Sequence, residues 1–421
     1  MKFKSYIFII LVFFFASSFA QEKTVFDVVF RGVKKTKVST IKKLLGTKRG
    51  RILDSIQLKE DMGILKRLPA FAHANFKVFY SHDNSYKVFI DVEENITIIP
   101  FINFWTTTNK KFAYNIGLYD YNFLGKNIVF GGFYQNNGFD SYGINFRAPN
   151  LFSKRWGLAL NHQNWKSEEP LYFNNASANY LYNNVSFEIL GLFQINFKNE
   201  INFGINFFNE KYQYLSGETS LEIPQLLDVD KKLLKFVYKY DNLEYYYQYI
   251  SGFKSIFYGQ YVTSNNTFQN DFLIAWNDFF YYNRLGKKGN WANRIRVGLS
   301  SNEDSPFAPF ALDNNVNLRG VGILVDRGTG SIVWNTEYRH TLFEKSWFTL
   351  QGNAFVDAGT WRNPGGSLSD FTDSKNIKVY SGVGLRFINK KIFNAIFRID
   401  YGFGLTQGSS KGLVFGIGQY F

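Results

Sequence analysis

One arginine and two acidic residues in the last third of the sequence have the types and positions needed for an enclosed ion-pair cluster. Arg319 precedes Gly320 in a loop, residues 301–330, that is rich in glycine and aspartate. Glu337 and Asp357 lie in the two segments that follow this loop. A guanidinium group can bind carboxylates bidentately, and such pairs are stronger where water is excluded. The pattern therefore predicts that these charged residues hold a loop in place and catalyse no reaction.

The segments that carry the two carboxylates alternate in the manner of β-strands. In 348–359, Asp357 shares a polar face with Asn353 and Gln351. If the apolar faces meet lipid, Glu337 and Asp357 point into a barrel lumen, where they would meet Arg319 of an inserted loop. The same pairs could equally do no more than plug or stiffen the lumen. In 331–339 the two faces are Ile332, Trp334, Thr336 and Tyr338 on one side and Val333, Asn335, Glu337 and Arg339 on the other.

These residues carry a resemblance to a known superfamily. Leu318-Arg319-Gly320-Val321 resembles the VRGF/Y loop motif of the BamA/TamA-like outer-membrane assembly and translocation proteins, which include the bacterial surface antigens. Phe355-Val356-Asp357-Ala358-Gly359 resembles the FxDxG strand motif of the same superfamily. The resemblance implies that the loop arginine docks on acidic residues of the barrel wall, here Glu337 and Asp357. Leu318 and Val321 stand where the motif usually has valine and an aromatic residue.

The composition favours a transmembrane barrel. The 421 residues include 47 Phe and 27 Tyr, yet mean hydropathy is −0.20. An apolar outer band with aromatic girdles around a polar interior produces this combination. Residues 96–421 contain alternating segments separated by turns, and at roughly 20 residues per strand and connection they predict ~16 antiparallel strands. A helical turn is allowed only between Pro224 and Lys235, and a soluble β-sandwich or propeller is the less favoured alternative.

Residues 1–20 resemble a secretory signal peptide. Lys2 and Lys4 precede an apolar stretch, and Ser18-Phe19-Ala20 provides small residues for cleavage. No later window of about 18 consecutive apolar residues predicts a transmembrane helix. Export combined with aromatic strands predicts that the barrel, residues 96–421, lies in the outer membrane.

Residues 24–95 predict a small α+β domain with the element order β-α-α-β-β. Helices are expected after Lys37 and after Asp54 or Ser55, which can cap the second helix. Two strands, 75–81 and 85–92, are joined by a hairpin turn at Asp83-Asn84.

This domain resembles a POTRA domain over its length. The resemblance is carried by residues 30–36, 65–71 and 88–94. It implies a periplasmic module that binds incoming chains by adding a strand at a sheet edge. A rigid spacer that orients the barrel is the alternative, and the sequence favours neither.

The first and last strands of the predicted barrel have features of a weakly paired seam. The first strand, 97–106, contains Pro100, which lacks a backbone donor. The last strand, 412–421, is expected to turn Gly416 and Gly418 inward, where they pack little. Such a seam could open and template an incoming strand. The outward face of the last strand is expected to carry Leu413, Phe415, Ile417 and Phe421, and a terminal aromatic residue resembles the β-signal of outer-membrane barrels.

Other kinds of site receive little support from the sequence. There is no cysteine, and the four histidines, His73, His82, His162 and His340, lack the spacing of metal ligands. No nucleophile–base pair is evident, so we expect neither an enzyme nor a cofactor. The net charge is +14, but the lysines lie in turns and do not form one face. This distribution argues against a nucleic-acid partner and favours contact with anionic outer-membrane lipids.

The resemblance implies a barrel with one POTRA domain that helps outer-membrane proteins insert or carries a polypeptide across the membrane. Its expected partners are unfolded outer-membrane or exported polypeptides, membrane lipids and accessory periplasmic proteins. A passive pore is the alternative, since a barrel of this size can enclose a channel, although a simple porin needs no POTRA domain. A two-partner secretion transporter usually has two POTRA domains and a plug helix, and fits less well.

Overall fold

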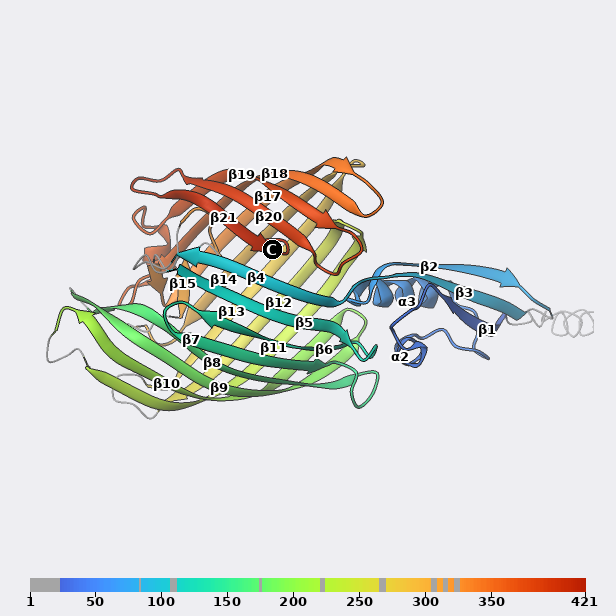
Figure 1. The fold of residues 1–421 in the computed structure, drawn as a ribbon, viewed down its shortest axis with the longest axis horizontal. Coiled ribbons are helices and arrows are strands. Elements are labelled where there is room, and N and C mark those ends of the chain that lie inside the picture. Colours follow the sequence, from blue (N-terminus) through green and yellow to red (C-terminus); the bar gives the residue numbers. More distant parts are fainter. Residues whose placement is uncertain are drawn as a thin grey trace, which may run out of the picture.

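The computed structural model describes residues 23–82, 85–106, 112–173, 176–219, 224–264, 270–303, 309–312, 317–321 and 326–421. A small α+β domain precedes a barrel of antiparallel strands (Figure 1). The predicted signal peptide, residues 1–20, and the predicted hairpin turn Asp83-Asn84 lie outside the described residues. Within the described ranges, no helix is both long enough and apolar enough to cross a membrane.

The N-terminal domain has the element order that the sequence predicts. It consists of β1 (Thr24–Arg31), α2 (Val38–Leu44), α3 (Ser55–Arg67), β2 (Phe71–Tyr80) and β3 (Ser85–Glu94). The sheet order is β1-β3-β2, with β1 parallel to β3. Asp54 caps α3, because its carboxylate accepts a hydrogen bond from the backbone N–H of Ile56. The helices and the sheet enclose an apolar core of Val25, Ile41, Leu45, Leu58, Met62, Leu65, Phe71, Val88 and Ile90.

The barrel is one 16-stranded antiparallel sheet, nearly closed, which confirms the predicted strand number. Neighbouring strands follow the chain order except that β14 pairs with β17, because the loop between them holds a separate short hairpin. That hairpin consists of β15 (Phe310–Leu312) and β16 (Asp326–Gly328). A short 3-10 helix, η1 (Leu368–Thr372), lies between β18 and β19. The barrel strands are β4 (Ile98–Thr106), β5 (Phe112–Phe123), β6 (Ile128–Asn136), β7 (Asp140–Ala148), β8 (Trp156–Phe173), β9 (Ala176–Asn196), β10 (Asn199–Gly217), β11 (Leu226–Tyr246), β12 (Tyr249–Ser264), β13 (Phe272–Leu285), β14 (Gly289–Ser300), β17 (Gly330–Glu344), β18 (Phe348–Arg362), β19 (Lys378–Asn389), β20 (Ile396–Gly404) and β21 (Lys411–Ile417).

On β17, polar side chains face the lumen and aromatic ones face outward, as the alternation predicts. On β17, Asn335 and Arg339 are fully buried and Glu337 is 1% exposed. Trp334 and Tyr338 on the opposite face are 45% and 40% exposed. This distribution is the one expected of a barrel that presents an apolar outer surface to lipid.

The helical turn allowed between Pro224 and Lys235 is absent, and this prediction is wrong. The segment from Leu226 onward belongs to β11, which pairs continuously with β10. Leu227 and Val229 point into the barrel, whereas Leu226 is exposed outside it. Alternation with a period of two residues buries the apolar side chains of this segment better than a helical period would.

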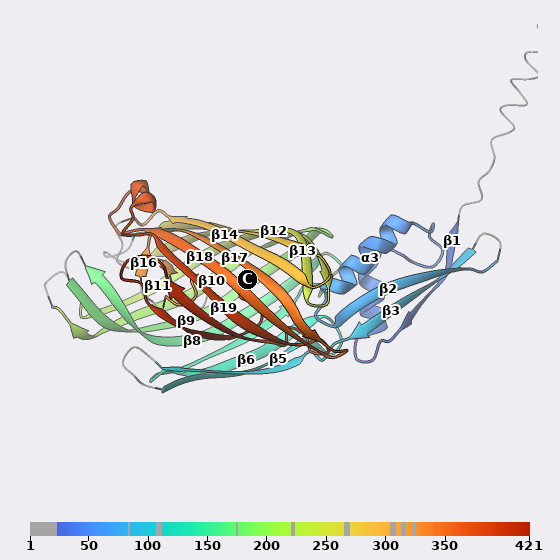
Figure 2. The same cartoon turned by 90° about the horizontal axis from the view of Figure 1, so that it is seen from above.

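The α+β domain lies against the hairpin turns at one end of the barrel, here called the domain end (Figure 2). Nη1 of Arg67 in α3 donates to the carbonyl of Phe197 at 2.9 Å, and Nη2 donates to that of Leu243 at 3.0 Å. Nδ2 of Asn122, near the end of β5, donates to the hydroxyl of Thr36 at 2.9 Å. These contacts join the domain to several turns at once, so they fix its orientation under the barrel.

Candidate functional site in the barrel lumen

The tip of the loop between β14 and β17 is buried inside the barrel. Leu318 and Arg319 are fully buried, and Val321 is almost so. Leu318 and Val321 pack in one cluster with Val333, Trp361 and Tyr380. The two positions that depart from the loop motif therefore supply apolar contacts that hold the loop against the wall.

Two glycines allow the loop to approach the wall closely. Gly320 has φ +98°, in the left-handed region that favours glycine. A Cβ at Gly320 would lie 2.8 Å from the carbonyl carbon of Gly402 on β20. A Cβ at Gly402 would lie 2.4 Å from the carbonyl oxygen of Arg319. The loop and β20 therefore meet backbone to backbone.

Arg319 forms ion pairs with both carboxylates that the sequence singles out. Its Nε and Nη2 donate to the two oxygens of Asp357 at 2.8 and 2.9 Å, and its backbone N–H donates to the same carboxylate at 3.0 Å. Nη1 of Arg319 lies 2.5 Å from Glu337. The Arg319, Asp357 and Glu337 side chains are completely buried, so water does not screen these pairs.

The pairs around Arg319 extend into a larger network across β14, β17, β19 and β20. Glu337 also pairs with Arg339 and Arg386, and Asp400 pairs with Arg386 and Arg398. Arg294 donates to Asn335, which in turn donates to Asp357. We call the five arginines Arg294, Arg319, Arg339, Arg386 and Arg398 the arginine cluster. Within the described residues, Arg319, Arg339, Arg386 and Arg398 form ion pairs with three carboxylates, those of Glu337, Asp357 and Asp400.

Aromatic rings complete the surroundings of Arg319. The guanidinium carbon lies 3.6 Å from the ring centre of Phe355 on β18. It lies 4.5 Å from the ring centre of Tyr420, which follows β21. Cation–π attraction of this kind strengthens where the cation is desolvated.

The end of the chain departs from the predicted outward course. β21 ends at Ile417, and Gly418 has φ +84°, which breaks the alternation of the strand. Phe421 enters the lumen and packs against the cluster of Leu243, Tyr282 and Ala292. The prediction that Phe421 faces outward is therefore wrong. Inside the barrel, the rings of Tyr420 and Phe421 contact four arginines, three from strands and one from the loop, together with apolar side chains. This environment favours the inward course over the predicted outward one.

The structure places the other predicted seam residues on the two strands that border a gap in the sheet. β4 pairs with β5, β21 pairs with β20, and the described backbone shows no strand pairing between β4 and β21. Pro100 lies opposite Leu118 on β5. Gly416 lies opposite Arg398, and an added Cβ there would meet the guanidinium group at 2.4 Å. Gly418 lies beyond the end of β21.

Arg386 on β19 and Arg398 and Asp400 on β20 also belong to this site, although no local feature of the sequence links them to Arg319. Their ion pairs with one another and with Glu337 connect strands that are distant in the sequence. The one local signal was the spacing of Arg398 and Asp400, which share a face two residues apart. Tyr420 gave no signal, since its place depends on the turn at Gly418.

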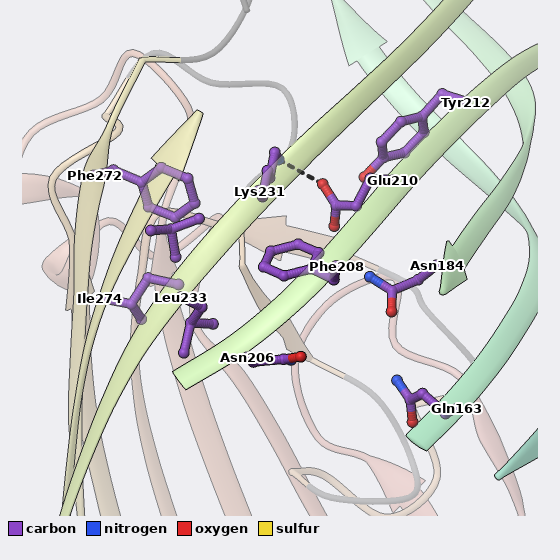
Figure 3. A pocket seen from close by; sticks show the side chains of 11 residues that line it. Gln163, Asn184, Asn206, Phe208, Glu210, Tyr212, Lys231, Leu233, Phe272 and Ile274 are labelled. Carbon is purple, nitrogen blue, oxygen red and sulfur yellow. Dashed lines mark hydrogen bonds and ion pairs between the residues drawn. The ribbon is translucent and has the colours of Figure 1, made fainter. Parts of the chain in front are cut away.

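Another part of the lumen wall, from β8 to β13, carries its own ion pairs and a pocket of about 240 Å³ (Figure 3). Lys231 and Glu210, which line this pocket, form an ion pair of 2.5 Å, and Lys235 on the same strand as Lys231 pairs with Glu188. No group of His, Cys, Asp and Glu in the described ranges has the arrangement of a metal site. Carboxamides and apolar side chains line opposite sides of the pocket: Gln163, Asn184 and Asn206 against Leu233, Phe272 and Ile274.

No protein family and no curated protein sequence matches the chain. Solved structures do. BamA from Haemophilus ducreyi lacking POTRA domains 1-3 aligns with a TM-score of 0.56 at 16% identity, over 93% of this chain and 83% of that one. CdiB from Acinetobacter baumannii gives 0.60 at 11% identity, over 94% and 73% of the two chains. CdiB from Escherichia coli gives 0.61 at 11% identity, over 94% and 75%. The chain thus has the fold of these BamA and CdiB structures.

Proposed function

We propose that this protein is an outer-membrane barrel that helps other outer-membrane proteins insert or carries a polypeptide across the membrane. The observation that carries the proposal is the gap between β4 and β21, where the outer edge of each strand pairs with no other strand of the described residues. Unpaired strand edges bind further strands readily, because their N–H and C=O groups are available. The shared fold with BamA and CdiB supports the same reading.

In this proposal an incoming strand pairs with the free edge of β4 and enters the membrane through the gap. Pro100 removes one donor from β4 and keeps its pairing weak. The Arg319 loop holds the wall from β17 to β20 rigid through Glu337 and Asp357 while the gap changes width. No covalent bond of the polypeptide is made or broken.

The N-terminal domain acts in this proposal as a POTRA module in the periplasm. β2 is an edge strand of the described sheet, whose order is β1-β3-β2, and its outer edge would receive an extended segment of a client. The domain also contacts several hairpin turns of the barrel, which suits an orienting spacer equally well. Accessory periplasmic proteins would bind on this side of the membrane.

Depletion of the protein, with proteomics of the outer membrane, tests the proposal. Complementation would use a chain with one cysteine on β4, Ile102→Cys, and one on β21, Leu413→Cys, linked by a bismaleimide. The chain has no cysteine of its own, so the linkage is unambiguous. Each single-cysteine chain treated with the same reagent is the matched control.

We expect depletion to remove many barrel proteins from the outer membrane, or one exported protein if the chain is a dedicated translocase. The single-cysteine chains should restore them, and the linked chain should not. Full rescue by the linked chain would contradict the gap mechanism. An unchanged proteome with altered uptake of small solutes would indicate a passive pore instead.

A further inference from the structure

The pocket between β8 and β13 lies toward the end of the lumen that is remote from the α+β domain. β11 meets the domain near its last residues, at Leu243, so the start of β11 and the end of its antiparallel partner β12 lie at the opposite end of the barrel. Lys231, near the start of β11, and Val262, near the end of β12, both line the pocket. If the domain is periplasmic, as proposed, this end of the lumen faces the cell exterior.

Two walls of different chemistry border the pocket (Figure 3). One wall consists of three carboxamides from neighbouring strands, those of Gln163 on β8, Asn184 on β9 and Asn206 on β10. The other wall is apolar and consists of Leu233, Val262, Phe272 and Ile274. A ligand that fits both walls needs hydrogen-bonding groups along one edge and an apolar face on the other side.

The charged groups of the pocket are paired with each other. Nζ of Lys231 donates to Oε2 of Glu210 at 2.5 Å, and the hydroxyl of Tyr182 donates to Oε1 of the same carboxylate at 2.9 Å. The Lys231 side chain is only 3% exposed. An ionic ligand would have to break this buried pair or leave its own charge unpaired, and both are unfavourable. The pocket therefore favours a neutral ligand.

One hydrogen-bonding atom of the carboxamide wall has no partner. Oδ1 of Asn206 is buried and accepts no hydrogen bond from the described residues. A buried acceptor without a donor is unfavourable. Water can supply the missing donor, but a ligand that displaces the water must offer the same hydrogen bonds. Hydroxyl groups do so, because each one donates and accepts as water does.

The volume of the pocket limits the ligand to about one ring. Pockets for drug-sized ligands usually span roughly 300–1,000 Å³, whereas this one has about 240 Å³. A pyranose ring carries hydroxyls around its edge and C–H groups on its faces, so its edge suits the carboxamides and one face suits Phe272 and Ile274. An extended peptide is also neutral, but its donors and acceptors follow one line, whereas the three carboxamides stand on three adjacent strands.

We propose that this lumenal pocket is a binding site for one neutral sugar residue. Asn206 accepts a hydrogen bond from one hydroxyl, Gln163 and Asn184 bond to its neighbours, and a face of the sugar ring packs on the apolar wall. The proposal goes beyond the proposed function, since it gives the lumen a saccharide ligand in addition to any polypeptide client.

Saturation-transfer difference NMR on the full chain tests the proposal. The probes are the methyl glycosides of glucose, galactose, mannose and N-acetylglucosamine. The protein is kept in lauryldimethylamine oxide, because the sugar head groups of maltoside detergents would compete for the pocket. At least one probe should bind saturably with a dissociation constant of about 1 mM, weak because so small a ligand makes few contacts. Its C–H protons on one ring face should receive the most saturation, since that face packs on the apolar wall.

A matched pair of asparagine variants locates the site. Asn206→Leu removes the acceptor that has no partner, and it should weaken sugar binding at least tenfold. Asn115→Leu removes a carboxamide on β5, outside the pocket, whose Oδ1 is likewise buried without a partner among the described residues. This control should bind the sugar as the unmodified chain does. Equal binding by the two variants would overturn the assignment.

A pocket-filling variant decides the matter if Asn206→Leu does not fold. Leu233→Phe keeps every polar group of the pocket and fills its space with a ring, so sugar binding should be lost while the β-sheet signal in circular dichroism persists. Binding that survives in Leu233→Phe would contradict the proposal, as would the absence of saturable binding by every probe.

A capped alanine tripeptide, titrated in the same way, separates a sugar site from a peptide site. We expect it not to bind saturably. Its binding in place of the sugars, with the same sensitivity to Asn206→Leu, would overturn the proposal in favour of a peptide ligand. None of these measurements depends on the complementation test of the proposed function, so the two can fail separately.

Discussion

The imidazole of His73 on β2 stacks on the ring of Tyr247 in the turn between β11 and β12. The ring centres lie 5.5 Å apart and the planes differ by 13°. Tyr246 meets the same imidazole edge-on at 6.0 Å, and the hydroxyl of Tyr247 donates to Glu93 at 2.8 Å. A titratable side chain of the α+β domain is therefore part of its contact with the barrel.

This contact should weaken in mild acid. Burial, and then the charge of Lys66, lower the pKa of His73 below 6.5, while Glu93 opposes the shift. A histidine with a lowered pKa is favoured neutral in the packed state, so its contribution is complete above pH 6.5 and declines as pH falls below it. We expect the domain to sample more orientations at about pH 5.5 than at about pH 7.5.

Spin labels on Lys59→Cys in α3 and Lys198→Cys in the β9–β10 turn can measure this change. The distance distribution should broaden on acidification of the chain that contains His73. His73→Phe keeps a ring for Tyr247 but cannot titrate, so its distribution should not respond to pH. The same broadening in both chains would show that another group is responsible.

The carboxylate of Glu94 should hold the 34–36 segment in place above its pKa. Burial disfavours the charged form, but hydrogen bonds from the Thr36 hydroxyl and from the backbone N–H groups of Lys34, Lys35 and Thr36 outweigh it, and the pKa is lowered. A lowered carboxyl pKa adds stability that is present above the ordinary value of 4.5 and is lost as pH falls through the folded pKa.

Hydrogen exchange can follow those three amides. In Glu94→Gln they should lose most of their protection at neutral pH, whereas the unmodified chain should lose it only in acid below about pH 4.5. Glu60→Gln, at an exposed position of α3, is the control and should behave like the unmodified chain. Unchanged protection in Glu94→Gln would contradict the assignment.

Asp357→Asn should destabilise the barrel strongly. It removes the charge that faces Nε and Nη2 of the buried Arg319, and breaking one partner of a buried pair costs about 3–5 kcal/mol. Urea unfolding followed by tryptophan fluorescence would report the loss. Asp228→Asn is the control, because Asp228 is half-exposed and its pair with Lys211 should contribute at most about 1 kcal/mol. Equal losses would indicate that burial of the Arg319 pair is unimportant.

Gly402→Ala should displace the Arg319 loop without altering any charge. Its Cβ would lie 2.4 Å from the carbonyl oxygen of Arg319, so either the loop or β20 must move. Protease cleavage within residues 301–330 should become faster. Gly412→Ala, on the neighbouring strand, is the matched control, because no atom lies within 4 Å of its Cβ. A cleavage rate that rises equally in both would point to general loosening of the barrel.

Local patterns in the sequence carry much of this fold. Alternation with a period of two residues puts Asn335, Glu337 and Arg339 on the lumenal face of β17. Asp54 caps the N-terminus of α3. Strand number follows from alternating segments and turns, because each strand of a meandering barrel pairs with its neighbours in sequence. These features depend on short stretches of chain.

Other features depend on residues that are distant in sequence, and local patterns do not reveal them. The alternating pattern of β21 continues in the sequence as far as Phe421. In the structure, however, the chain turns at Gly418 toward arginines from β14, β17, β20 and the loop. The pattern at 224–235 could also be read as a helical turn. The long register with β10 decides it in favour of a strand.

The start of the first barrel strand has a consequence for how the gap can widen. The backbone N–H and C=O of Ile96 bond to Lys391 and Phe393 in the turn between β19 and β20, at 2.9 and 3.0 Å. Both backbone groups of this residue are thus tied to the other side of the gap at the domain end. At the domain end, these two hydrogen bonds therefore join the two sides of the gap. Separation of β4 from β21 must therefore start at the opposite end and progress toward the hydrogen bonds of Ile96.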